Sequence, residues 1–380
     1  METPRTAPAA VIRVGARLRD GGPSGASALA VELGLSRTAV ENALATLEDL
    51  GLVTHAPGTP GGAGRPARRF AFAADAGVVL GLDVGVHSVR CRVVDLAGFV
   101  ISQRTDPGLE AQAGPADQVD SVIATAEACL AEAASGRVRA VGVALPGIVD
   151  DTSRVVASVV LPGWTGIDVV GILGSRLGCP AALDNGVRLA ALAEHHIGAG
   201  RLFEDVLHVA VGSRVAVGMV LGGEARRGVH HLAGDIGRVA FSDLVDPAGQ
   251  LRWRSAAGAR EVFELAERGD VSAVAEIEAV VAQLGRGIAT VAMAVDPGVV
   301  VVGGGLTQAG EAFLQPLRDE LARLFGDHAR IPVLAGELGV EAAVRGAVIH
   351  AFTRCSQAIH GLDGMPPPLG SATPGVTPSA

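Results

Sequence analysis

The sequence contains no lysine and no tyrosine, so all 31 of its basic residues are arginines, a bias that we attribute to genome composition. The four cysteines, Cys91, Cys129, Cys179 and Cys355, are scattered and form no Cys-x-x-Cys pair. This spacing argues against a disulfide framework and against a thiolate metal site. No uninterrupted apolar run approaches twenty residues and no signal peptide is recognisable, so we expect a cytoplasmic protein without a membrane span.

Small and apolar residues dominate what is present. The chain has 380 residues, 49% of them hydrophobic, with 52 glycines and 20 prolines. These values predict two or three domains of an α/β class with a large core. Charge is uneven, because residues 1–74 carry eight arginines and six acidic residues, whereas the remainder carries 23 arginines and 34 acidic residues. A slightly basic head on an acidic body suits a protein whose small domain alone contacts phosphates.

Residues 1–74 show a pattern of short helices. A first helix is expected from Ala9 to Leu18, and a second over residues 28–33, with Gly34 as the turn that follows. Ser36 is the expected N-cap of a third helix. The apolar face of that helix is formed by Val40, Leu44, Leu47 and Leu50. Two helices joined by a short turn, the second amphipathic, are typical of a helix-turn-helix.

The polar face of the third helix would meet the bases of DNA in the major groove. We predict DNA contacts from Ser36, Arg37, Thr38, Glu41 and Asn42, with Arg37 on guanine or phosphate and Asn42 on adenine. Short strands at residues 52–54 and 69–72, joined by a Gly- and Pro-rich loop, predict a β-wing. Its Arg65, Arg68 and Arg69 suit phosphate or minor-groove contact. The alternative is a small helical protein-interaction domain with a solvated arginine loop.

The body repeats a strand-turn-strand unit. Residues 78–85 and 88–95 form one unit, and residues 206–211 and 215–221 form a similar one, which suggests two related lobes. Later, residues 299–302 run into Gly303 and Gly304. Glycine turns after strands can hold phosphate through backbone N–H groups. The candidate nucleotide-site residues are Asp83, Gly85, Gly212, Gly303 and Gly304. From Gly361 the chain is rich in proline, glycine and serine, and we expect disorder over 361–380.

Several segments resemble, in order, those of the ROK family (repressor, open reading frame, kinase). They are Gly64–Pro66, Leu82–Gly85, Val141–Asp150, Leu161–Trp164, Asn185–Glu194, Gly228–Gly237 and Val299–Gly305. The resemblance implies a winged helix-turn-helix at 1–74 and a two-lobed actin/hexokinase-like (ribonuclease H-like) body. The lobes would cover 75–198 and 199–360, with the C-terminal helix returning to the first. Kinase members phosphorylate sugars with ATP, whereas regulators bind DNA as dimers or tetramers.

The chain departs from the pattern of the kinases. The resemblance places the catalytic aspartate at Gly186, whereas Asp184 lies before Asn185 and would point elsewhere unless the pattern has shifted by one residue. General-base catalysis needs a carboxylate within hydrogen-bond reach, so catalysis is not expected. Arg214 and Ala216 replace glycines of the second phosphate loop, which makes ATP binding doubtful. Arg238 occupies the zinc histidine position, and the cysteine positions fall near Arg252, Arg254 and Ala259, so no zinc site is expected.

The cleft could still hold an effector. The candidates are Trp164, which could stack on a ring, together with Asn185, Asp235, Arg238 and Glu261. Because Arg238 and Arg214 would face the cleft, the ligand could be a sugar, a sugar phosphate or another anion; alternatively, these arginines form internal salt bridges. The neighbouring His230 and His231 are not expected to bind metal.

Together these patterns predict a regulator, with a double-stranded DNA operator as partner, a homodimer or homotetramer, and no catalytic residue, cofactor or metal. The alternatives are an ATP-dependent sugar kinase with a DNA-binding head, and a DNA-binding scaffold that has no ligand.

Overall fold

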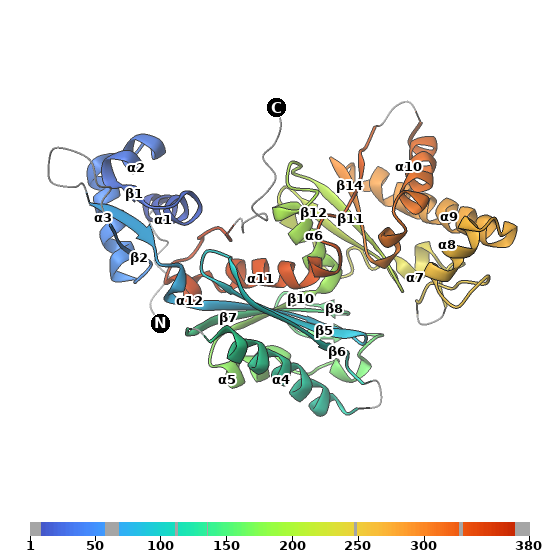
Figure 1. Ribbon diagram of the computed structural model, residues 1–380, viewed down its shortest axis with the longest axis horizontal. Helices are drawn as coiled ribbons and strands as arrows, with labels where there is room; N and C mark the ends of the chain where they lie inside the picture. The colour runs from blue at the N-terminus through green and yellow to red at the C-terminus, as the bar shows by residue number, and fades with distance from the viewer. Residues whose placement is uncertain are drawn as a thin grey trace.

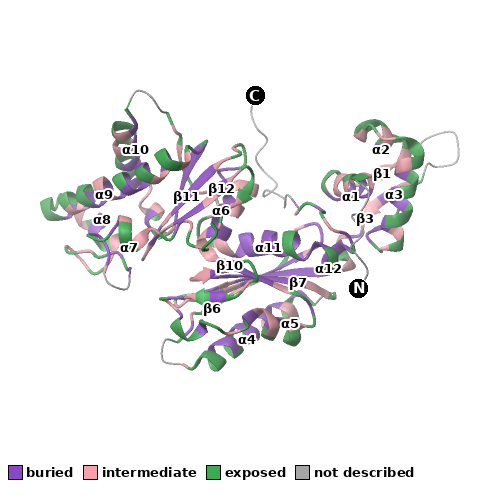
Figure 2. Cartoon of the chain, turned by 180° about the vertical axis from the view of Figure 1, so that it is seen from behind, coloured by how far each residue is buried: buried purple, intermediate pink, exposed green. Residues whose placement is uncertain are grey.

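The computed structural model describes residues 9–57, 68–110, 113–134, 136–246, 249–326 and 330–368. A small N-terminal head lies beside a body that contains two five-stranded sheets (Figure 1). The strands of both large sheets are mostly buried, and the exposed residues gather on the outer faces of the helices (Figure 2).

The head combines three helices with a small antiparallel sheet. Its elements are α1 (Ala9–Gly21), β1 (Ser24–Gly25), α2 (Ala26–Leu33), α3 (Arg37–Asp49), β2 (Val53–Ala56) and β3 (Arg69–Phe72), with the strand order β1-β3-β2. The three predicted helices are confirmed, and the Ser36 hydroxyl caps α3 by accepting a hydrogen bond of 3.2 Å from Ala39 N. Gly34, at φ 60°, ends α2 in the left-handed conformation that favours glycine. Val40, Leu44 and Leu47 are buried in the core of the head, as their spacing predicts.

The first large sheet has the strand order β10-β7-β4-β5-β6. Its strands are β4 (Val78–Val84), β5 (Ser88–Asp95), β6 (Val100–Pro107), β7 (Val138–Leu145) and β10 (Ala181–Asn185). Helices α4 (Pro115–Ala133) and α5 (Val169–Leu177) cover one face, and α11 (Ala342–Arg354) packs on β4 and β7 from the other (Figure 1). A small two-stranded sheet of β8 (Ile148–Val149) and β9 (Val155–Ala157) lies near the end of β10.

The second large sheet has the order β13-β12-β11-β14-β15. Its strands are β11 (Val206–Val211), β12 (Val215–Leu221), β13 (Glu224–Ala225), β14 (Val299–Gly303) and β15 (Val333–Ala335). The remaining helices are α6 (Gly186–Ile197), α7 (Gly237–Ala240), α8 (Ala259–Glu267), α9 (Val271–Val295), α10 (Glu311–Phe325) and α12 (Ser356–His360). Short 3₁₀ turns are η1 (Ala74–Ala76), η2 (Pro162–Trp164), η3 (Gly305–Ala309) and η5 (Gly339–Glu341).

The predicted internal repeat is present. In each sheet an antiparallel hairpin, β4–β5 or β11–β12, lies next to a parallel strand, β7 or β14. Helix α6 connects the two units and packs on α11 and β12. The four cysteines are buried and unbridged. Helix α9 is long and apolar enough to cross a membrane, but half of its apolar window is buried, and Leu284 and Ile288 belong to the core of the second lobe.

The segment that follows α12 corrects the prediction of disorder. Residues 361–368, which we call the C-terminal strap, lie between the head and the body. Met365 is only 2% exposed and its Cε lies 3.1 Å from the position that a Cβ on Gly15 of α1 would occupy. Arg19 donates hydrogen bonds of 2.6 and 3.3 Å to the carbonyls of Pro366 and Pro367. The prediction is therefore wrong for the strap, because proline carbonyls and one buried methionine fix it; residues 369–380 lie outside the described part of the chain.

Candidate functional site

A cleft of about 470 Å³ lies between the two large sheets and is lined by residues of both. Most of its walls are formed by valine, alanine and glycine. The polar and charged side chains among its described lining residues are Asp83, Asn185, Arg188, His208, Arg214, His231, Asp235 and Arg238. A mostly apolar pocket with a few convergent polar groups is the usual form of a small-molecule site.

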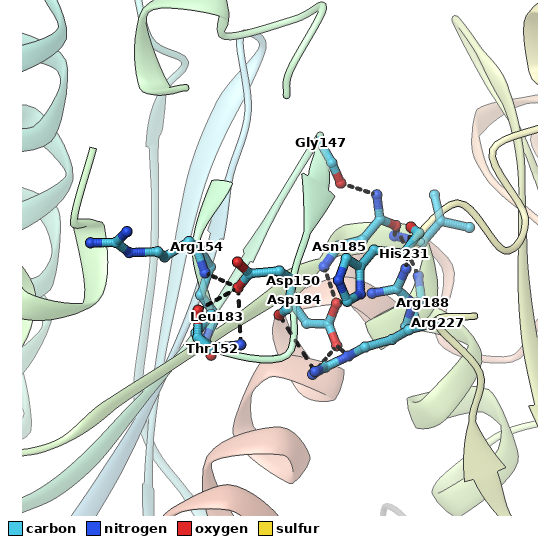
Figure 3. Close-up of polar contacts among 12 residues, drawn as sticks. Gly147, Asp150, Thr152, Arg154, Leu183, Asp184, Asn185, Arg188, Arg227 and His231 are labelled. Carbon is cyan, nitrogen blue, oxygen red and sulfur yellow. Dashed lines mark hydrogen bonds and ion pairs between the residues drawn. The ribbon is translucent and has the colours of Figure 1, made fainter. Parts of the chain in front are cut away.

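The first turn of α6 lies at one wall of this cleft. Asn185 is the N-cap of the helix, and its Oδ1 accepts hydrogen bonds from Val187 N at 2.9 Å and Arg188 N at 3.2 Å. Its Nδ2 donates to the carbonyl of Gly147 at 2.7 Å (Figure 3). Both the oxygen and the nitrogen of the Asn185 amide thus form hydrogen bonds within the protein, although the residue lines the cleft as predicted.

Gly186 lines the cleft and supplies no carboxylate. A Cβ at this position would meet only the Leu145 backbone, at 3.8 Å from its carbonyl oxygen, so packing leaves room for a side chain. The fold therefore has room for an acidic side chain at position 186, and packing does not explain why glycine stands there.

Asp184 is held in a buried ion-pair cluster. Its side chain is 3% exposed; Oδ1 pairs with Arg188, and Oδ2 accepts from Arg227 Nη2 at 2.7 Å and Nε at 2.9 Å (Figure 3). Oδ1 also accepts from Asn185 N at 2.7 Å. These bonds occupy both oxygens, and Asp184 is not among the residues that line the cleft. The geometry therefore gives no support to a one-residue shift of the catalytic acid.

The candidate nucleotide turns converge only in part. Asp83, Gly85 and Gly304 line the cleft, whereas Gly212 and Gly303 do not. Burial raises the pKa of Asp83 to about 6, although Arg90, whose Nη1 lies 3.2 Å from Oδ2, lowers it. Gly304 has φ 91°, and a Cβ there would lie 2.5 Å from the Val211 carbonyl oxygen, so this turn needs glycine for close packing of the backbone.

Two of the predicted effector residues lie elsewhere. The indole of Trp164 is fully buried in the core of the first lobe, and its Nε1 donates to Gln118 Oε1 at 2.7 Å, so it cannot stack on a ligand in the cleft. Glu261 is exposed on the first turn of α8, where Oε2 accepts from Ala257 N at 3.1 Å. Asp235 and Arg238 do line the cleft. The two corrections have different reasons: Trp164 is held in the core by a bond to Gln118 of α4, whereas Glu261 accepts a bond within its own turn.

Arg214 and Arg238 converge on one backbone position. A Cβ on Gly249 would lie 3.3 Å from Arg214 Nη1 and 3.3 Å from Arg238 Cγ. His231 lines the cleft and the exposed His230 does not. Within the described ranges, no group of three or more His, Cys, Asp or Glu residues is placed to hold a metal ion.

Sequence reasoning missed Arg188 and His208 as cleft residues. His208 points from β11, and burial lowers its pKa to about 4, so the ring is neutral. An inward-facing histidine on an apolar strand gave no distinguishing signal. Helical spacing would not have identified the ion pair of Asp184 with Arg188, because Asp184 lies in β10 and Arg188 in α6.

The predicted DNA-contacting side chains lie at the start of α3. Ser36, Arg37, Thr38, Glu41 and Asn42 are all exposed. Arg37 Nε donates to Glu41 Oε1 at 2.9 Å, an exposed pair that a stronger anion can replace at little cost.

The predicted wing residues have separate outcomes. Arg68 is exposed, and Arg69 Nη2 donates to the Pro23 carbonyl at 2.5 Å. Arg65 lies outside the described residues.

Comparison with known proteins shows which family the body resembles. The ROK family model matches residues 79–250 and 243–353. The bifunctional enzyme NanE/NanK of Brucella melitensis is 30% identical over 200 residues, which cover 48% of this chain and 37% of that protein. The chain thus spans little more than a third of the length of this relative.

Two solved structures have the same fold. The ROK hexokinase from Thermus thermophilus is 26% identical, with a TM-score of 0.62, and the match covers 74% of this chain and 99% of that one. A ROK family transcriptional regulator, a homologue of the E. coli MLC protein, is 19% identical, with a TM-score of 0.71 over 92% of this chain and 96% of that one.

The body therefore has the α/β actin/hexokinase-like fold that the resemblance implies, and the match to the regulator extends into the head. The family model covers well over half of the chain. The chain belongs to the ROK family.

Proposed function

We propose that this chain is a cytoplasmic DNA-binding transcription regulator, with residues 1–74 as a winged helix-turn-helix. The observation that carries the proposal is the exposed polar turn at the start of α3. This helix belongs to a helix pair that is followed by the β2–β3 hairpin. In this arrangement α3 would enter the major groove, where Arg37 and Asn42 would reach base edges. Arg65 and Arg68 would contact phosphates beside it.

The body supports this function as an effector and assembly domain. With glycine at position 186 and Asp184 enclosed by two arginines, the cleft offers no carboxylate at the position where the family's kinases remove a proton. Lobes at 75–198 and 199–360 would pair with a second copy to give a homodimer or homotetramer, because a palindromic operator mirrors the symmetry of its protein.

The proposal is tested by selecting bound duplexes from a random DNA pool with the full chain. We expect a shared motif to be enriched, and the double variant Arg37→Ala/Asn42→Ala to lose that enrichment. Arg254→Ala changes an exposed arginine of the body and is the matched control. Failure of the unchanged chain to enrich any motif would overturn the proposal.

A sugar kinase is the second candidate, favoured by the 26% identity to the hexokinase and by Asp83 in the cleft. It predicts release of ADP in a coupled assay with ATP and a panel of sugars. Turnover that Asp83→Asn abolishes would establish the kinase; we expect no turnover with any sugar.

A further inference from the structure

We propose that the cleft binds an organic acid with an apolar body, whose carboxylate lies between Arg214 and Arg238. The inference rests on the proposed function only in that the acid would be the effector of the regulator.

The walls of the cleft favour an apolar body. Val159 and Val340 line it and are 52% and 53% exposed, and Val160, Val187 and Ala233 continue the same surface. Exposed valines on a concave surface gain free energy when an apolar ligand removes them from water.

The polar groups of the same cleft suit a sugar poorly. A sugar needs partners for many hydroxyls, and each buried hydroxyl without a hydrogen bond weakens binding. The amide of Asn185 already bonds to Val187 N, Arg188 N and the Gly147 carbonyl. Asp184 is enclosed by arginines. A neutral hexose would therefore leave hydroxyls unpaired.

The two converging arginines supply the site for an anion. Arg214 immediately precedes β12 and Arg238 lies in α7, and Gly249, which has no side chain, lies against both. Burial lowers the pKa of Arg214, and Arg238 lowers it further, whereas Asp246 raises it. Each guanidinium is positive, so an anion that lies near both is attracted by both, with Asp246 as a nearby competitor at Arg214.

Further charged side chains line the cleft. Asp235 also lines the cleft but is exposed to water, and the third lining arginine, Arg188, is paired with Asp184. The planar guanidinium fork binds the two oxygens of a carboxylate in parallel, which favours an acid group over a hydroxyl.

Isothermal titration calorimetry of the full chain tests the inference with four probes: 2-naphthoate, its neutral amide, glucose and inorganic phosphate. We expect only 2-naphthoate to bind well, since it alone combines an apolar body with a carboxylate. Arg238→Gln and Arg214→Gln should each weaken its affinity about tenfold or more, as for loss of a charge-assisted hydrogen bond. Arg254→Gln, an exposed arginine away from the cleft, should leave the affinity unchanged.

Four results would overturn the inference: equal binding of acid and amide, tighter binding of glucose, phosphate binding as tightly as naphthoate, or no binding at millimolar concentration. Enrichment of DNA by the same preparations checks that each variant is folded. Absence of DNA enrichment with intact naphthoate binding would remove the regulator but not the acid site. Absence of naphthoate binding with intact DNA enrichment would remove the acid site alone.

Discussion

Replacing Asp184 with asparagine should destabilise the body, because we expect this residue to have a structural and not a catalytic role. The substitution removes the negative charge shared by two guanidinium groups whose side chains are 5% and 18% exposed, those of Arg188 and Arg227. Removing one partner of a buried ion pair costs about 3–5 kcal/mol, because the remaining charge stays buried without compensation. We therefore expect the free energy of unfolding of the first lobe to fall by about that amount.

Urea unfolding followed by tryptophan fluorescence in a Trp253→Phe background measures this loss, because Trp164, fully buried in the core of that lobe, is then the one remaining tryptophan. Arg227→Gln is the companion variant. The double variant Asp184→Asn/Arg227→Gln should lose less than the sum of the two single losses, by about 0.5–3 kcal/mol, since the two residues bond to each other. An Asp184→Asn protein as stable as the parent would refute the reasoning. If the parent chain phosphorylated a sugar and the variant did not, Asp184 would be the catalytic base.

Three further predictions concern the rest of the chain. Gly186→Asp should fold with an unchanged melting temperature by calorimetry, because a Cβ there meets only the Leu145 carbonyl at 3.8 Å; a fall of several degrees would show that the wall is tighter. Met365→Asp should release the strap, and hydrogen exchange should then accelerate in α1 but not in α9; unchanged exchange in α1 would mean that the strap does not fix the head. Burial lowers the pKa of His360 to about 3, so the folded ring is neutral, and stability present above about pH 6.5 is lost as the pH falls from 6.5 toward 3. His360→Phe should make this pH dependence less steep in urea unfolding, while buried His208 and His350 keep part of it; an identical profile would assign all of it to other groups.

Local signals made the head predictable. Ser36 followed by an apolar stripe fixed the start and the buried face of α3, because capping and helical spacing depend only on neighbours in the sequence. The strand-turn-strand units were equally accessible, since each is a hairpin of adjacent residues.

Long-range contacts were not predictable in this way. The ion pair of Asp184 with Arg227 joins residues 43 positions apart, and the bond from Arg19 to Pro366 spans 347. The strap was misjudged because proline and glycine content predicts disorder, whereas one methionine and a few carbonyls suffice once the head presents a complementary surface. Trp164 was misassigned for a related reason, because its partner Gln118 lies on α4, and only the fold brings the two together.

We propose that the head, and not the cleft, carries the protein's main activity. Fluorescence anisotropy of the full chain on a selected duplex and on its scrambled counterpart, at fixed salt, tests it most directly. We expect the chain to bind the selected duplex more tightly than the scrambled one by about 10³-fold or more, with an affinity that falls steeply as salt rises. Equal affinity for both duplexes would contradict it.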